Sequence, residues 1–342
     1  MRLVAALLLF APMTTVTAQG RCGGDRAGSA SCDTMPFKAP FAATGWKTVA
    51  LSHFTVQVAD YKREAAYYSA LMNWRQLSDD GSKAVMQMGD AGAVVIRGGY
   101  QAPPPPTPSP ADTAGRGGRG GGNRAPRKAV WDSFCFVIAP WDANKVKAAL
   151  ESRGLHPVAD NDGKFQSFHV KDPEGFDLQI ANSQRYPSGG GAQATGAPAP
   201  FASTNWKTTW LDHISFAVSN YKEDAAFYGA LLGWTSTGDE GSQNEMLMGD
   251  AGDILIRGGN ASTFNGTVPP HRVDINHISF GISPWDADGV KKELDARGLT
   301  GRPDTGGKGE IHTNPYQSYH TTTPDGFDLQ ISNINKSTRI VR

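Results

Sequence analysis

The chain contains a long internal repeat. Residues 51–99 recur as residues 211–259, 160 positions later and without a gap. About half of the aligned positions are identical, as LSHFTVQVADYKREAAYYSALMNW and LDHISFAVSNYKEDAAFYGALLGW show. A second pair follows, in which WDSFCFVIAPWDANKVKAALESRGL and FHVKDPEGFDLQIAN match INHISFGISPWDADGVKKELDARGL and YHTTTPDGFDLQISN. A duplication of this size sets the architecture, and positions that differ between the copies point to where function resides.

Length and charge limit the class of protein. The 342 residues are enough for two domains, each with its own core. Lys plus Arg and Asp plus Glu both number 33, so no net charge favours nucleic acid or an anionic membrane as a partner. We therefore expect no nucleic acid and no membrane as a partner. The expected partner is a small-molecule substrate, and a homodimer is left open.

The N-terminus has the pattern of a secretory signal peptide. Arg2 provides the positive charge, residues 3–10 the apolar stretch, and residues 16–18 a small-residue cleavage site. The apolar stretch is too short to span a bilayer, so we expect a soluble mature protein that is periplasmic or secreted. In that oxidising environment Cys22 and Cys32 could form a disulfide. Cys135 lies in an apolar strand pattern and is expected to be a buried free thiol.

Low-complexity segments divide the rest of the chain. The signal peptide covers residues 1–18 and a polar leader covers residues 19–45. Residues 102–128 and 187–200 are rich in Pro and Gly and cannot build a core. The sequence therefore predicts one domain over residues 46–186, with 102–128 as an insert, and another over residues 201–335. These are called the first half and the second half below.

Each half divides into two modules of one pattern. A module opens with an alternating strand, and in residues 211–218 one face is expected to hold Leu211, His213, Ser215 and Ala217. An amphipathic helix follows, and its aromatic residues are expected in the core: Tyr67, Tyr68, Phe227 and Tyr228. Three strands close the module, the last two joined by a tight DPEG or TPDG turn. The order is βαβββ, four times, and modules should pair because each alone leaves an edge exposed.

This order, with the DPEGFDLQ and TPDGFDLQ turns and the LDHI and INHI strands, resembles the vicinal oxygen chelate superfamily. The superfamily includes glyoxalase I, bleomycin-resistance proteins and extradiol dioxygenases. The resemblance implies an α+β fold in which four βαβββ modules pair into two eight-stranded open barrels, or cups. It also implies that the first and fourth strands of each module supply metal ligands that point into the cup.

Carrying the ligand positions over makes the two halves unequal. The first half offers His53, Ile96, Ser133 and Gln179, and the second offers His213, Ile256, His277 and Gln330. Ser133 thus stands where His277 stands. Two imidazoles on facing strands make a plausible metal site, whereas one is a poor start to such a site. The second half is therefore the candidate site, and Arg97 and Arg257, one residue beyond the isoleucines, are expected to point away from the cups.

The third metal ligand has two candidates. In the extradiol dioxygenases two histidines and a glutamate hold Fe(II), and Gln330 replaces that glutamate here. Asp328 lies two residues earlier on the same strand face, about 7 Å away, and could provide a carboxylate. The alternative is that Asp328 caps the turn or pairs with a basic neighbour, as the equivalent Asp177 in the first half suggests. The resemblance implies a divalent metal, Fe(II) with Mn or Zn as alternatives, or none.

Two further histidines are candidate catalytic groups. The resemblance implies acid/base residues just before the closing turn, where this sequence has His320. His169 occupies the same place in the first half, so a framework role for His320 is the alternative. His312 lies in a seven-residue insertion, residues 310–316, that only the second half has. A loop unique to the half with the candidate site could line its entrance.

Two functions follow from these patterns. One is an exported metal-dependent enzyme, of extradiol-dioxygenase or glyoxalase type, that acts on a small oxygen-rich or catecholic substrate in the second half. The other is a metal-free protein of bleomycin-resistance type that binds or sequesters a small molecule. The absence of the glutamate in both halves, and of one histidine in the first, favours the second function.

Overall fold

The computed structural model describes residues 38–101, 129–186, 196–240, 243–258, 274–307 and 309–339. The predicted signal peptide, Cys22, Cys32, the whole of residues 102–128 and most of residues 187–200 lie outside these residues. None of the helices in the described ranges is long and apolar enough to cross a membrane.

Each half contains two modules of order βαβββ, as the sequence predicts. The first half consists of β1 (Lys47–Val58), α1 (Tyr61–Met72), β2 (Arg75–Asp79), β3 (Lys83–Gln87), β4 (Ala93–Arg97), β5 (Ala129–Ala139), α2 (Ala143–Glu151), β6 (Val158–Ala159), β7 (Ser167–Lys171) and β8 (Asp177–Ala181). The second half consists of β9 (Lys207–Val218), α3 (Tyr221–Leu232), β10 (Thr235–Asp239), β11 (Gln243–Leu247), β12 (Asp253–Gly258), β13 (Asp274–Ser283), α4 (Ala287–Ala296), β14 (Arg302–Asp304), β15 (Ser318–Thr322) and β16 (Asp328–Ser332).

The two modules of each half pair into one open eight-stranded sheet. The strand orders are β2-β3-β4-β1-β5-β8-β7-β6 and β10-β11-β12-β9-β13-β16-β15-β14, so the two sheets have the same topology. The opening strands of paired modules, β1 with β5 and β9 with β13, run antiparallel at the centre of each sheet. Pairing therefore takes place within the chain, and the predicted α+β fold of two open cups is confirmed.

One face of each sheet packs against the other half of the molecule, and the opposite face is turned away from it. Phe134 of the first half lies 5.8 Å from Phe216 of the second, ring centre to ring centre, and a single hydrophobic core runs through both halves. The opposite face of each sheet, which carries the histidines, is called the cup face. Cys135 is a buried free thiol, as predicted.

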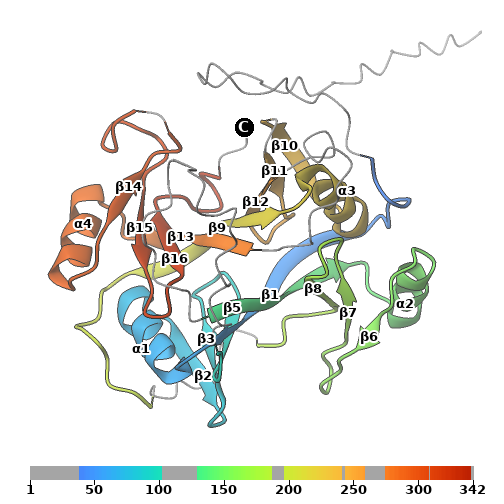
Figure 1. Ribbon diagram of the computed structural model, residues 1–342, viewed down its shortest axis with the longest axis horizontal. Helices are drawn as coiled ribbons and strands as arrows, with labels where there is room; N and C mark the ends of the chain where they lie inside the picture. The colour runs from blue at the N-terminus through green and yellow to red at the C-terminus, as the bar shows by residue number, and fades with distance from the viewer. Residues whose placement is uncertain are drawn as a thin grey trace, which may run out of the picture.

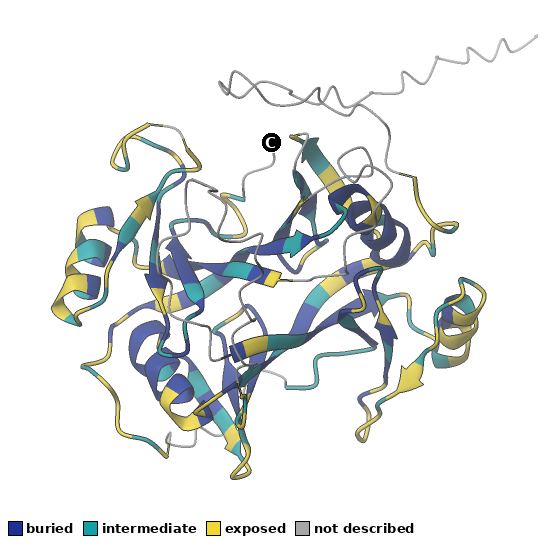
Figure 2. Ribbon diagram, in the orientation of Figure 1, coloured by how far each residue is buried: buried dark blue, intermediate teal, exposed yellow. Residues whose placement is uncertain are grey.

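Helix α1 lies at the lower left and α3 at the upper right, each next to strands of the other half, whereas α4 and α2 lie at the left and right ends of the molecule (Figure 1). Arg63 of α1 bonds Asp325 in the β15–β16 turn. Tyr228 of α3 donates to Asp172 in the β7–β8 turn at 2.8 Å. The helices are buried accordingly (Figure 2), and their aromatic residues are in the core as predicted: Tyr67, Tyr68, Phe227 and Tyr228.

The register corrects three predicted orientations. Ile256 is fully buried in the core, opposite Phe216, so Arg257 and not Ile256 faces the cup. In the first half Ile96 likewise lies in the core, and Arg97 lines the first cup. Leu211 is also in the core, because a bulge at residue 212 shifts the alternation of β9. At these points, the side chains predicted to face the cup are displaced by one residue along the strand from those that face it in the structure.

Candidate metal centre

The cup face of the second sheet carries two adjacent rows of polar side chains. The register pairs His213 with Ser279, Ser279 with Gln330, and Gln330 with His320, which makes one row across four strands. The next row pairs Ser215 with His277 and His277 with Asp328. Side chains opposite and diagonal in neighbouring strands are within reach of one another. The fold thus brings together five of the six predicted site residues: His213, His277, His320, Asp328 and Gln330.

The two histidines of the opening strands are in direct contact. Nε2 of His213 lies 3.0 Å from Nε2 of His277. Two nitrogens bound at about 2.1 Å to one ion, at right angles, are also about 3.0 Å apart. Without a metal, one N–H···N hydrogen bond between the two rings holds the nitrogens at this distance. The pair therefore already has the separation that two ligands of a common ion require.

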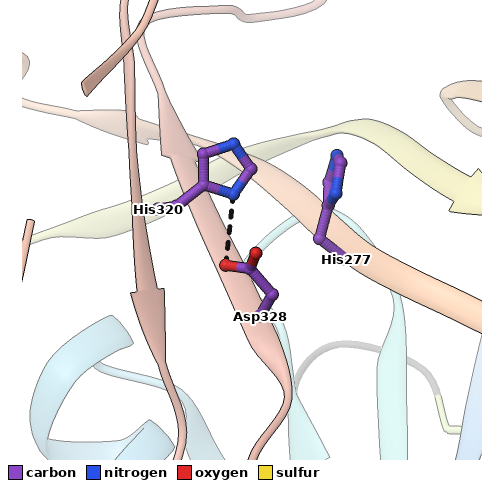
Figure 3. Close-up of side chains that lie close together, drawn as sticks. All are labelled: His277, His320 and Asp328. Carbon is purple, nitrogen blue, oxygen red and sulfur yellow. Dashed lines mark hydrogen bonds and ion pairs between the residues drawn. The ribbon is translucent and has the colours of Figure 1, made fainter. Parts of the chain in front are cut away.

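Asp328 and His320 lie beside His277 (Figure 3). One potential ligand atom from each of His277, His320 and Asp328 can be chosen so that all three lie within 4.8 Å of one another. The His277 and His320 rings are perpendicular, with their centres 4.9 Å apart. Asp328 accepts from Arg302 at 2.9 Å and lies 3.1 Å from Nδ1 of His320. Asp328 therefore does pair with a basic neighbour, which was the alternative role predicted for it. Its second oxygen lies toward His277 in Figure 3.

Asp212 provides a carboxylate behind His213. It is the extra residue of the β9 bulge, is 6 % exposed, and lies 3.5 Å from Nδ1 of His213. Burial acts to raise the pKa of Asp212, but His213, Ser279 and Ser332 outweigh it and hold the pKa below its usual range. A carboxylate at Nδ1 favours the tautomer whose Nε2 carries a free lone pair, as metal-binding histidines require.

A hydrogen-bond network supports Asp212 and continues to Gln330. Ser279 donates to Asp212 at 2.7 Å and Tyr316 donates to it at 3.1 Å. Nε2 of Gln330 donates to Tyr316 at 2.9 Å and to Ser318 at 2.7 Å. Because both hydroxyls already donate elsewhere, they fix which end of the amide is nitrogen. Oε1 of Gln330 is left buried, with no hydrogen-bond partner among the described residues.

The first half has apolar residues where this network lies. Cys135, Phe165 and Ala181 form a small hydrophobic cluster there, at the positions of Ser279, Tyr316 and Ser332. Ser52 replaces Asp212 and bonds Nδ1 of His53 at 3.1 Å. The two halves therefore differ in the support of the first histidine as well as in the presence of the second. This support was missed at the sequence level, although the aligned repeats contain it.

His320 is held between two carboxylates. Its Nδ1 lies 3.1 Å from Asp328 and its Nε2 lies 3.2 Å from Asp304. Burial acts to lower the pKa of His320, but these hydrogen bonds exceed it and raise the pKa above its ordinary value. In the first half His169 is 2.9 Å from Asp177 and 3.6 Å from Asp160. The clamp is thus common to both halves, and its neighbour His277 is what distinguishes the second.

His312 is the candidate that the structure does not bring to this cluster. Its ring nitrogens contact Glu310 of the same loop and Asp288 of α4, and its side chain is half exposed. The residue that enters the site instead is Tyr316, which matches Phe165 of the first half and is buried and bonded to Asp212. Tyrosine four residues beyond His312 in the same loop gave no separate signal in the sequence.

The cup of the first half is an open polar cleft of about 620 Å³. It is lined by His53, Ser133, Gln179 and the clamped His169, with charged residues that include Arg97, Asp132 and Lys171. Burial is the largest of the effects that lower the pKa of His53 to about 3, so its imidazole is neutral at pH 7. Because Ser133 stands on β5 where the second half has His277, this cleft lacks the pair of histidines on its two opening strands.

Paired βαβββ modules in two open eight-stranded sheets define the vicinal oxygen chelate fold, and solved structures of that fold are similar to this chain. The Mn(II)-bound glyoxalase from Novosphingobium aromaticivorans is similar over 87 % of each chain, with a TM-score of 0.58 and 14 % identity. The 2,3-dioxygenase LapB from Pseudomonas sp. KL28 is similar over 84 % of this chain and 92 % of its own, with a TM-score of 0.57 and 14 % identity.

A third similar structure is homoprotocatechuate 2,3-dioxygenase from Brevibacterium fuscum, in complex with 3,4-dihydroxyphenylacetate. It matches over 88 % of this chain and 84 % of its own, with a TM-score of 0.56 and 15 % identity. No protein-family model matches the sequence, and a comparison with curated proteins finds no match either. At these identities the likeness shows the fold, and the resemblance inferred from the sequence is confirmed at that level.

Proposed function

We propose that the second half is a metal-dependent enzyme that acts on a small oxygen-rich or catecholic substrate. The observation that carries the proposal is the His213–His277 pair, with Nε2 atoms 3.0 Å apart and the ionised Asp212 behind His213. The similar structures include a Mn(II)-bound glyoxalase and 2,3-dioxygenases, which is consistent with such an activity. Export, which rests on the first 18 residues, is a separate part of the proposal.

His213 and His277, whose Nε2 atoms are in contact, would hold the ion together with Asp328, which lies in one cluster with His277 and His320. The unpartnered Oε1 of Gln330 offers a further neutral ligand. A divalent ion bound there supplies Lewis acidity toward adjacent oxygens of the substrate. Asp212 and its hydroxyl partners fix the ring of His213. His320 lies beside His277 with its two ring nitrogens bonded to Asp304 and Asp328, and release of one of these bonds would free that nitrogen to exchange a proton with a bound substrate. Fe(II) or Mn(II) suits two imidazoles and a carboxylate.

Metal analysis of the full chain tests the proposal. After purification without chelators and reconstitution with Fe(II) or Mn(II), we expect about one equivalent in the wild type and less than about 0.2 in His213→Ala. His53→Ala, the matched change in the first half, should keep the full equivalent. Oxygen uptake with catechols, and isomerase assays with 2-oxoaldehyde adducts, should follow the metal content. Equal and negligible metal in all three proteins would favour the metal-free binding function instead.

Restoring the glutamate provides a second test. Gln330→Glu adds a carboxylate beside Asp212, Asp304 and Asp328, and it loses the two bonds that Nε2 donates. Without metal, we expect the variant to be less stable by about 1–3 kcal/mol, because a buried charge lacks a partner. With metal, we expect affinity to rise about tenfold or more, since a carboxylate binds a divalent ion more strongly than an amide. Competition with a fluorescent chelator measures this, and an unchanged affinity would remove Gln330 from the ligand set.

A further inference from the structure

The second cup contains a cation, Arg257, for which none of the described residues provides a counterion. Arg257 of β12 pairs in register with Ala217, which follows His213 and Ser215 on the cup face of β9. Its Nε is buried, and Arg257 makes neither a hydrogen bond nor an ion pair with any residue in the described ranges. Burial is the main effect on Arg257 and lowers the pKa of its guanidinium. A partly buried guanidinium without a partner is costly in a folded protein.

The two carboxylates whose charges act on Arg257 make their contacts with other residues. Glu240 and Asp304 act on Arg257 through their charges, yet neither forms an ion pair with it. Asp304 lies against Nε2 of His320 at 3.2 Å, and Glu240 accepts from Gln243 at 2.7 Å. The positive charge of Arg257 therefore remains directed at the cup.

The first half shows how this arginine is normally satisfied. Arg97, the equivalent residue, forms an ion pair with Asp132 at 3.4 Å. Asp132 lies in a bulge of β5 between Trp131 and Ser133, and both Asp132 and Ser133 line the first cup. The same bulge in β13 holds Asn276, between Ile275 and His277. One bulge thus differs twice between the halves, because it gains a histidine and loses the aspartate that would neutralise the arginine.

We propose that Arg257 binds a carboxylate of the substrate, so that the second half acts on an organic acid and not on a neutral catechol or ketone. The inference deepens the proposed function and rests on it. The planar guanidinium matches a carboxylate through two parallel hydrogen bonds. From strand rise and spacing, the backbones of Arg257 and His277 are roughly 12 Å apart. Because both side chains stand roughly perpendicular to the same sheet face, their tips are separated by a similar distance, which accommodates one ring with a short acidic chain.

Binding of an acid and its neutral isostere to the metal-free full chain tests the proposal. The probes are 3,4-dihydroxyphenylacetate and 3,4-dihydroxyphenylacetamide, measured by calorimetry. We expect the acid to bind at least about tenfold more tightly in the wild type. Arg257→Gln should reduce this ratio to about one, and so should Asn276→Asp, which copies the first half. Arg97→Gln, the matched control, should keep the tenfold ratio. Equal affinities in the wild type, no binding of either probe, or an unchanged ratio in Arg257→Gln would overturn the proposal.

A measurement without ligand checks the missing counterion directly. Asn276→Asp should raise the melting temperature by about 2 °C, as a new ion pair of modest strength would, and should have no such effect in the Arg257→Gln background. If Asn276→Asp raises it equally in both backgrounds, or lowers it, Arg257 does not lack a counterion and the proposal fails. Metal content separates the two proposals. If Arg257→Gln keeps its metal but no longer prefers the acid, both proposals are supported. If the wild type prefers the acid but holds no metal, only the proposed enzyme function is contradicted.

Discussion

His277→Ser, which copies Ser133 of the first half into the second, is expected to abolish metal retention. One of two imidazoles is lost, and the remaining His213 resembles His53, which has no histidine opposite it. Outer-sphere partners alone are worth about 10- to 100-fold in metal affinity, so the loss of a ligand should exceed about 100-fold. Chelator competition with Mn(II) or Fe(II) measures the change, and circular dichroism shows whether the variant is folded.

The reciprocal change provides the control. Ser133→His places a second imidazole in the first cup, but Ser52 stands where Asp212 supports the second. Phe165 and Cys135 also replace two hydroxyls of the network. We therefore expect no measurable metal site in the first half of this variant. Retention of a full equivalent by His277→Ser, or a gain by Ser133→His, would show that the difference between the halves lies elsewhere.

Glu64→Gln is expected to stabilise the protein at alkaline pH. Glu64 of α1 is 1 % exposed, and both its oxygens lack a hydrogen bond at normal distance from any described residue. Burial, with the charge of Asp325, raises the pKa of Glu64 from 4.5 to about 8. The folded state therefore binds this proton more tightly than the unfolded state. The resulting stabilisation is complete below about pH 4.5 and is lost as pH rises through about 8.

Glutamine keeps the shape without the ionisation. At pH 9 we expect Glu64→Gln to raise the free energy of unfolding by about 2–5 kcal/mol, and to have little effect at pH 4. Urea unfolding at both pH values measures the difference. Glu223→Gln, at an exposed position in the first turn of α3, is the matched control and should change little. An equal effect of Glu64→Gln at pH 4 and pH 9 would mean that its ionisation is not linked to folding.

The fold could be predicted from the sequence because its signals are local and repeated. The DPEG and TPDG turns and the alternating opening strands define four modules, and the structure has all four. The face of the strand on which each side chain lies could not be predicted reliably. An extra residue at 212 and another at 276 turn side chains to the other face, and bulges have no clear signature in one sequence.

The candidate site was predicted in part, for a related reason. The histidines and Gln330 occupy matched motif positions, so comparison of the repeats identifies them. Asp212, Ser279 and Tyr316 act through contacts between segments more than 30 residues apart, and no local pattern announces such contacts. Arg257 was expected to point outward because its neighbour Ile256 was assigned to the cup.

The contacts that α1, α3 and the residues after them make with the opposite half have a consequence for how the chain unfolds. Trp234 donates to Thr48 at 2.9 Å, and Trp74 donates to Thr208 at 2.8 Å, so each half anchors an indole in the other. Loss of either half would expose the inward face of the remaining sheet to water. The duplicated chain should therefore unfold in one cooperative transition, and neither half should fold as an independent piece.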